Sequence, residues 1–140
     1  MSNKTFIANV DARQCVAAAF FALTLADFAA NDGVVEVAMP NGAQVVGGSI
    51  NVTTEFDDGD SATIAVGTPG TPGRYLAAHT VATAGRTALV STGFQHLSDD
   101  SGAAPPVLLT LATGDGDATE GEVWVEIQYV VAEKSEWTQD

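Results

Sequence analysis

The sequence predicts a single all-β domain, an antiparallel sandwich or barrel. Turn signals rich in Gly, Pro, Asn and Asp recur at short intervals, and segments of strand length, rich in β-branched residues, lie between them. Several of these segments alternate apolar and polar residues, a pattern typical of a strand with one buried face. The length of 140 residues and the hydrophobic content of 46% suit one domain with one core.

The first apolar segment, residues 12–28, has an ambiguous period. Its alanines favour a helix, and its large apolar residues fit either a helix or a strand: Phe20, Phe21, Leu23 and Leu25. We expect a strand here. Residues 15–26 also imitate the apolar core of a signal peptide, but Asp11 replaces the basic leader, and the run falls short of the roughly 20 apolar residues that span a bilayer. We therefore expect neither a cleaved signal nor a membrane span.

The clearest alternation lies in residues 45–67. One face of the first half carries Ile50, Val52, Thr54 and Phe56, and the other carries Ser49, Asn51, Thr53 and Glu55. After the acidic turn 57–60, apolar residues alternate with Ser61 and Thr63 in the same way, namely Ala62, Ile64 and Val66. The two halves therefore predict two strands that pair as a hairpin.

The final strand is almost as clear. Its inward residues are Val123, Val125, Ile127, Tyr129 and Val131, and Trp124 falls on the outer, polar face. Weaker patterns predict strands at 34–39, 74–81, 86–93 and 107–113, and the glycine-rich run 67–73 predicts a stiff surface loop. We expect a β domain over 15–133, an N-terminal arm at 1–14 and a C-terminal tail at 134–140.

The charge of the chain restricts its partners. The 5 basic and 18 acidic residues give a formal net charge of −13. Such a chain repels phosphate backbones and anionic membranes and has no basic stripe for counterion release. We therefore expect no nucleic acid and no membrane partner, and a basic surface is the natural complement.

The residues that commonly carry chemistry are not arranged as a catalytic or metal motif. Cys15, His79 and His96 lack ligand spacing, so we expect a buried free thiol and surface or hydrogen-bonded histidines. The acidic loops 57–60 and 115–120 depart from the EF-hand order, although calcium remains an alternative there. No phosphate loop or nucleophile elbow is present. The sequence thus predicts no catalytic residue, no metal, no cofactor and no enzyme.

The two tryptophans are the candidates for interface contacts. Trp124 lies on the polar face of the last predicted strand, and Trp137 lies in the acidic tail. Tryptophan is enriched among interface anchors because it buries a large area at low entropic cost. The alternative for Trp124 is that another part of its own chain covers it.

Five segments together resemble small capsid-associated proteins of tailed bacteriophages. They are 40–56 (PNGAQVVGGSINVTTEF), 61–67 (SATIAVG), 74–77 (RYLA), 84–90 (AGRTALV) and the strand 123–131. The pattern is similar to that of the jelly-roll cement protein of a Bordetella phage.

The resemblance implies a jelly roll and a non-enzymatic structural role. Such a protein decorates the outer capsid surface of the virion, stabilises the capsid by bridging major capsid subunits, and is made in the cytoplasm of the bacterial host. The partners implied are the major capsid protein and further copies of the chain, as a dimer or else a trimer. The interface residues expected are Trp124, Trp137, Tyr75 and Arg74.

A carbohydrate-binding β-sandwich of a phage tail or baseplate is the alternative. In that case Trp124, Tyr75 or Trp137 would stack against sugar rings.

Overall fold

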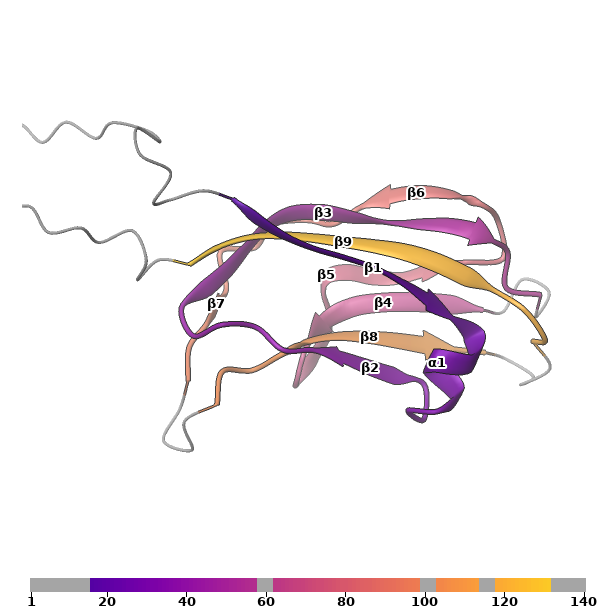
Figure 1. The fold of residues 1–140 in the computed structure, drawn as a ribbon, viewed down its shortest axis with the longest axis horizontal. Helices are drawn as coiled ribbons and strands as arrows, with labels where there is room; N and C mark the ends of the chain where they lie inside the picture. Colours follow the sequence, from indigo (N-terminus) through magenta and orange to yellow (C-terminus); the bar gives the residue numbers. More distant parts are fainter. Residues whose placement is uncertain (1–15, 58–61, 99–102, 114–117, 132–140) are drawn as a thin grey trace, which may run out of the picture.

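Two antiparallel sheets packed face to face form the protein, as Figure 1 shows. The computed structural model describes residues 16–57, 62–98, 103–113 and 118–131. The first sheet has the order β1 (Ala17–Thr24), β9 (Glu122–Val131), β3 (Ala43–Thr54) and β6 (Gly85–Ala88), and the short β7 (Gln95–His96) also pairs with β3. The second sheet has the order β2 (Val34–Val37), β8 (Val107–Ala112), β4 (Thr63–Thr68) and β5 (Thr71–Thr80). One short helix, α1 (Leu25–Ala29), connects β1 to β2.

The chain crosses repeatedly between the two sheets. In the described part of the chain, β4 and β5 are the one pair of consecutive strands that hydrogen-bond to each other. The four-stranded paths β1-β9-β3-β6 and β2-β8-β4-β5 are those of a jelly roll, in which two sheets share one core. The prediction of a single all-β, jelly-roll-like domain is confirmed. The predicted arm at 1–14 and tail at 134–140 lie outside the described residues.

The core lies between the sheets, and the predicted alternation supplies nearly half of its buried residues. The buried residues include Ile50, Val52, Phe56, Ala62, Ile64, Val66, Val123, Val125 and Ile127. Thr54 was expected on the buried face, but it is exposed. The pairing of β3 with β9 slips between Val52 and Thr54, so the strand's two-residue period breaks at that point.

The predicted hairpin over residues 45–67 is wrong. Both strands exist, but β3 pairs with β9 and β6 whereas β4 pairs with β8 and β5. The chain between them crosses from one sheet to the other, and the backbone N–H of Phe56 donates to Val81 O at 3.0 Å. Phe56 is 1% exposed, so this crossing closes one end of the core.

A tight hairpin occupies residues 67–73, where a loop was expected. Thr68 of β4 pairs with Thr71 of β5, and only Pro69 and Gly70 lie between them. Gly70 has φ +84°, the left-handed conformation that glycine adopts without a steric cost. A proline followed by a glycine with positive φ is typical of a type II turn.

The ambiguous segment 12–28 contains both a strand and a helix. The strand prediction is confirmed for Ala17–Thr24 and wrong for residues 25–28, which belong to α1. A capping box begins the helix, because Thr24 N–H donates to Asp27 Oδ2 at 2.8 Å and Asp27 N–H donates to Thr24 Oγ1 at 3.4 Å. Phe28 is fully buried and meets the Phe56 ring edge-on, with centroids 6.5 Å apart.

The weaker strand predictions overlap β2, β5, β6 and β8, with shifted ends. β5 begins earlier than predicted, at Thr71, and β6 already ends at Ala88. The two-residue strand β7 was not predicted. No helix in the described part of the chain is long and apolar enough to cross a membrane.

Candidate interaction surface

An apolar patch lies on the outer face of the first sheet, beside its β1 edge. Phe20 is 62% exposed and Trp124 is 37% exposed, and their ring centroids lie 5.3 Å apart at an interplanar angle of 33°. Ala22 pairs with Trp124 across β1 and β9, and Ala18 continues the outer face of β1. We call Ala18, Phe20, Ala22 and Trp124 the Phe20–Trp124 patch.

Strand alternation points these four side chains outward. In β1, Ala19, Phe21 and Leu23 pack on the core, so the intervening residues face the other side of the sheet. In β9, Val123 and Val125 are fully buried, so Trp124 between them faces outward. The patch is therefore fixed by the same alternation that builds the core.

Polar and charged side chains border the patch. Glu126 of β9 pairs with Phe20 of β1, and Asn51 of β3 pairs with Trp124 of β9. Arg86 of β6 pairs with Asn51 and places a positive charge farther along the same face. An apolar centre with a polar border is the arrangement found at protein interfaces.

The predicted interface residues separate in the structure. Trp124 lies in the patch, and the prediction that it faces outward is confirmed. Tyr75 is 1% exposed, so its side chain offers no surface to a partner, and we correct the prediction that it lies at an interface. Trp137 lies outside the described residues.

Arg74 is held by its own chain. Its guanidinium carbon lies 4.0 Å from the centre of the Phe94 ring, Nε donates to Thr68 Oγ1 at 2.8 Å, and Nη2 donates to Thr71 Oγ1 at 3.2 Å. These contacts fasten the β4–β5 hairpin to the segment that leads into β7. The side chain therefore stabilises the fold, and it is not part of the patch.

Phe20 was missed by the sequence prediction, although a signal for it exists. Consecutive residues of a strand point to opposite faces, so the pair Phe20–Phe21 places one ring outward in either register. In the structure Phe21 packs on the core and Phe20 is exposed.

The two histidines are hydrogen-bonded, as expected. His96 is fully buried between Tyr75 and the carbonyl of Pro105, and burial lowers the pKa of His96 and raises that of Tyr75. His79 Nε2 lies 3.0 Å from Thr87 Oγ1. Cys15 lies outside the described residues, so its predicted burial stays a prediction.

Asp57 joins two loops at one end of the sandwich. Its carboxylate accepts hydrogen bonds from Thr119 N–H at 2.6 Å, from Glu120 N–H at 2.9 Å and from the Thr119 hydroxyl. These bonds, that from the Thr119 hydroxyl above all, lower the pKa of Asp57 to about 2. This carboxylate is thus occupied by donors of its own chain.

The described residues hold no group of three or more His, Cys, Asp or Glu side chains that could bind a metal ion. Of the other acidic loop residues considered for calcium, Glu120 is exposed, and four lie outside the described ranges: Asp58, Asp60, Asp115 and Asp117. Calcium binding in these loops stays the alternative to the prediction that the chain binds no metal.

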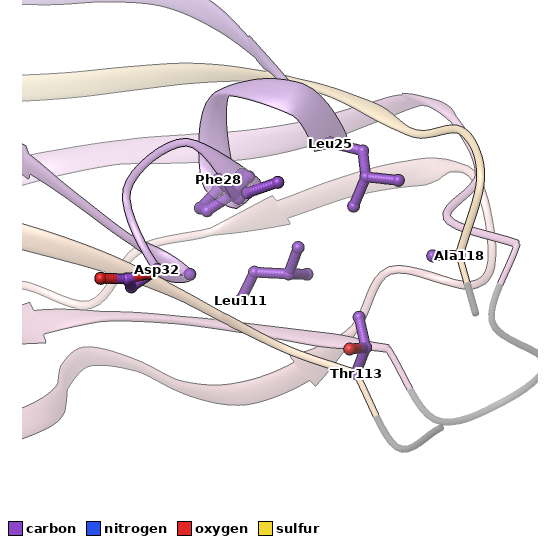
Figure 2. A pocket seen from close by; sticks show the side chains of 8 residues that line it. Leu25, Phe28, Asp32, Leu111, Thr113 and Ala118 are labelled. Atoms are coloured by element: carbon purple, nitrogen blue, oxygen red, sulfur yellow. The ribbon is translucent and has the colours of Figure 1, made fainter. Parts of the chain in front are cut away.

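A hollow of about 370 Å³ lies beside α1, between the helix and the end of β8 (Figure 2). Leu25, Phe28 and Leu111 give it an apolar lining, and Asp32 is the one charged residue among those that line it. General acid–base catalysis commonly uses one group as the acid and another as the base, and this lining offers a single carboxylate. The lining therefore does not indicate an active site.

Comparison with known proteins connects the fold to viral capsids. Neither a protein-family model nor a curated protein sequence matches the chain. A chain of the capsid asymmetric unit of cyanophage Pam1 matches with a TM-score of 0.67 and 19% identity, covering 92% of this chain and 94% of that one.

Two further phage capsids contain similar chains. In the acidic stable capsid of Helicobacter pylori bacteriophage KHP30, a chain matches with a TM-score of 0.59 and 17% identity, covering 82% of this chain and 86% of that one. In the capsid of Ralstonia phage GP4, the TM-score is 0.53 and the identity 18%, with 82% and 83% covered. At these identities the likeness is one of fold, and it extends over most of each chain.

Proposed function

We propose that this chain is a non-enzymatic structural protein of a phage virion that decorates the outer capsid surface and bridges major capsid subunits. The observation that carries the proposal is the fold: chains from three different phage capsids share it over 82% or more of this chain. The match to nearly the whole of the cyanophage chain supports a protein of this size acting as a separate capsid component.

The surface of the molecule supports a binding role. The Phe20–Trp124 patch exposes two neighbouring aromatic rings, tilted against each other, on the outer face of the first sheet, and such rings are frequent anchors in protein interfaces. The remaining surface belongs to a chain of net charge −13, which suits a basic partner surface around an apolar centre.

A protein that bridges two capsid subunits would stabilise the capsid. A protein that contacts two capsid subunits at once gains the second contact at a high effective concentration. Because it binds the assembled state and not the separated subunits, it stabilises the assembled state by mass action. We therefore expect tighter binding to expanded heads than to precursor shells, and production in the cytoplasm of the bacterial host.

A binding experiment with purified components tests the proposal. The protein is mixed with expanded heads that lack it, and the bound fraction is measured by co-sedimentation. The wild type should bind, and Trp124→Ala should weaken binding by about 2 kcal/mol, roughly thirtyfold. Leu97→Ala removes another exposed apolar side chain, 53% exposed and outside the patch, and should bind like the wild type. Absence of binding by the folded wild type would refute the proposal.

Carbohydrate binding is a second candidate, favoured by the same aromatic pair. Phe20 and Trp124 form an exposed platform, and Glu126 and Asn51 beside it are able to bond sugar hydroxyls. In this case the protein would bind defined glycans on an array, and Trp124→Ala would abolish that signal. Glycan binding without head binding would favour a tail or baseplate module.

A further inference from the structure

The four edges of the two sheets differ in how they are protected. An edge strand exposes unpaired N–H and C=O groups, and proteins usually block such edges with charges, prolines, bulges or short strands. β2 has four residues and an exposed Glu36, and β6 has four residues and an exposed Arg86. β5 contains Pro72, and its pairing with β4 is interrupted by two register shifts.

β1 has none of these protective features. Its sequence AAAFFALT contains no charge, no proline and no glycine, and its eight residues pair with β9 in an unbroken register. Phe20 at its centre is 62% exposed. Among the described strands, β1 is therefore the edge best suited to pair with another strand.

The hydrogen bonds at the end of β1 show which backbone groups face outward. Leu25 N–H donates to Gly121 O at 3.0 Å, on the β9 side, whereas Thr24 N–H donates to Asp27 Oδ2, away from β9. Backbone groups of successive strand residues point alternately to the two sides. The N–H and C=O groups of Ala18, Phe20 and Ala22 therefore point to the free edge.

We infer that the β1 edge pairs antiparallel with β1 of a second copy, about a two-fold axis through Phe20. In this register Phe20 lies opposite Phe20 of the partner, and Ala18 lies opposite the partner's Ala22. All the outward N–H and C=O groups of these three residues then pair, which gives about six hydrogen bonds. The dimer is one continuous sheet across both copies.

The sequence of β1 suits pairing with β1 of a second copy of the chain. On the outer face, Ala18 and Ala22 lie symmetrically about Phe20, so the reversed strand places alanine opposite alanine and a ring opposite a ring there. Because the copies share one sheet and one outer face, their two Phe20–Trp124 patches merge into a single aromatic strip. Aromatic pairs opposite each other in antiparallel strands stabilise a sheet.

The charge of the chain also favours this edge. Two copies of net charge −13 repel each other, but β1 itself is neutral. The nearest acidic side chains of the outer face, Glu122 and Glu126, lie on β9. Three strand spacings separate the two β9 strands, about 14 Å, which exceeds the Debye length of about 8 Å at physiological salt. The repulsion is thus screened at this contact.

Sedimentation velocity of the full chain over a range of concentrations tests the inference with a matched pair of variants. Ala18→Pro removes an N–H that faces the free edge and leaves the hydrogen bonds to β9 intact. Ala88→Pro makes the same change at the opposite edge of the same sheet, because Leu89 N–H bonds to Gly48 O and Ala88 N–H therefore points away from β3. Circular dichroism checks whether both variants fold.

The wild type should sediment as a dimer that dissociates on dilution. Ala18→Pro should raise the dissociation constant about tenfold or more, and Ala88→Pro should leave it within about twofold. If Ala18→Pro fails to fold, Phe20→Glu replaces it, since that side chain is largely exposed and the change places two carboxylates opposite each other. Hydrogen exchange of residues 16–24 should slow as the dimer forms.

A wild type that stays monomeric at all concentrations, or that forms a trimer, would overturn the inference. Equal effects of the two proline variants would overturn it as well. Slow exchange of β1 only when capsids are added would assign this edge to a capsid strand and not to a second copy. Because dimerisation is measured without capsids, its failure is distinguishable from failure of capsid binding.

Discussion

The Tyr75 hydroxyl lies 2.8 Å from Nε2 of His96, and both side chains are buried in the core. On the other side of the ring, Nδ1 lies 2.6 Å from the carbonyl oxygen of Pro105. A carbonyl only accepts, so Nδ1 carries the proton of the neutral ring and Nε2 accepts from Tyr75. The pair connects β5 to β7 and to the segment before β8.

Removing the Tyr75 hydroxyl should destabilise the fold. Tyr75→Phe leaves the buried Nε2 of His96 without its donor and should lower the free energy of unfolding by about 1–3 kcal/mol. Urea denaturation at pH 7.5 measures this. Tyr129→Phe serves as the control, because Tyr129 is only partly buried, and it should change the free energy by less than about 0.5 kcal/mol. Equal effects of the two variants would contradict the assigned hydrogen bond.

The burial of His96 predicts a loss of stability in mild acid. Burial lowers the pKa of His96 in the folded chain below its ordinary value of 6.5, so protons bind the unfolded chain first. The contribution of neutral His96 to the free energy of unfolding is complete above about pH 6.5, and it is lost as the pH falls through the lower pKa of the folded state. The free energy of unfolding should therefore fall between pH 7.5 and pH 5 in the wild type. His96→Gln should show a smaller fall, and an identical fall in both proteins would refute the assignment.

Asp57 should control stability at lower pH. Hydrogen bonds lower its pKa from 3.8 to about 2, so its contribution is present above pH 3.8 and is lost as the pH falls through about 2. Asp57→Asn should lower the Tm at pH 7 and flatten the dependence of Tm on pH between 4 and 2. Glu36→Gln removes an exposed carboxylate and should leave the Tm at pH 7 close to that of the wild type. A Tm of Asp57→Asn equal to that of Glu36→Gln would contradict the role of Asp57.

Gly48 should tolerate no side chain. Its φ is +127°, and a Cβ there would lie 3.0 Å from the carbonyl carbon of Glu126 and 3.1 Å from the Cα of Ile127. Backbone atoms cannot rotate away, so Gly48→Ala should cost about 3 kcal/mol or more. Gly70 also has a positive φ, +84°, but a Cβ there would meet nothing within 4 Å. Gly70→Ala should therefore lower the free energy of unfolding by only about 1–2 kcal/mol. Chemical denaturation of both variants checks the difference, which would vanish if β9 were not packed on β3 at this point.

Alternation in the sequence predicted which side chains are buried far better than which strands pair. The inward residues of β9 follow directly from a period of two, and so do Ile64 and Val66 of β4. Pairing depends on contacts distant in sequence: Ile50 of β3 lies opposite Val125 of β9. The short polar turn after β3 therefore led to the prediction of a hairpin. In the structure, the chain crosses from one sheet to the other at this turn.

The parts of the surface that were not predicted have local reasons. Phe20 and Phe21 are neighbouring residues of the same type, so the sequence does not show which ring is exposed. The packing of β1 in the folded chain decides it. The resemblance placed Tyr75 at an interface, but Tyr75 is buried with His96, a partner 21 residues away in the chain. The helix α1 has five residues, too few for a helical period, although Thr24 and Asp27 form a recognisable capping box.

Locating the protein in the virion tests the central claim most directly. We predict that a cryo-electron microscopy map of mature heads contains the two-sheet domain on the outer capsid surface, in contact with more than one major capsid subunit. Mass spectrometry of the same purified virions should detect the chain. Density for this domain only in the tail, or absence of the chain from virions, would contradict the proposed capsid role.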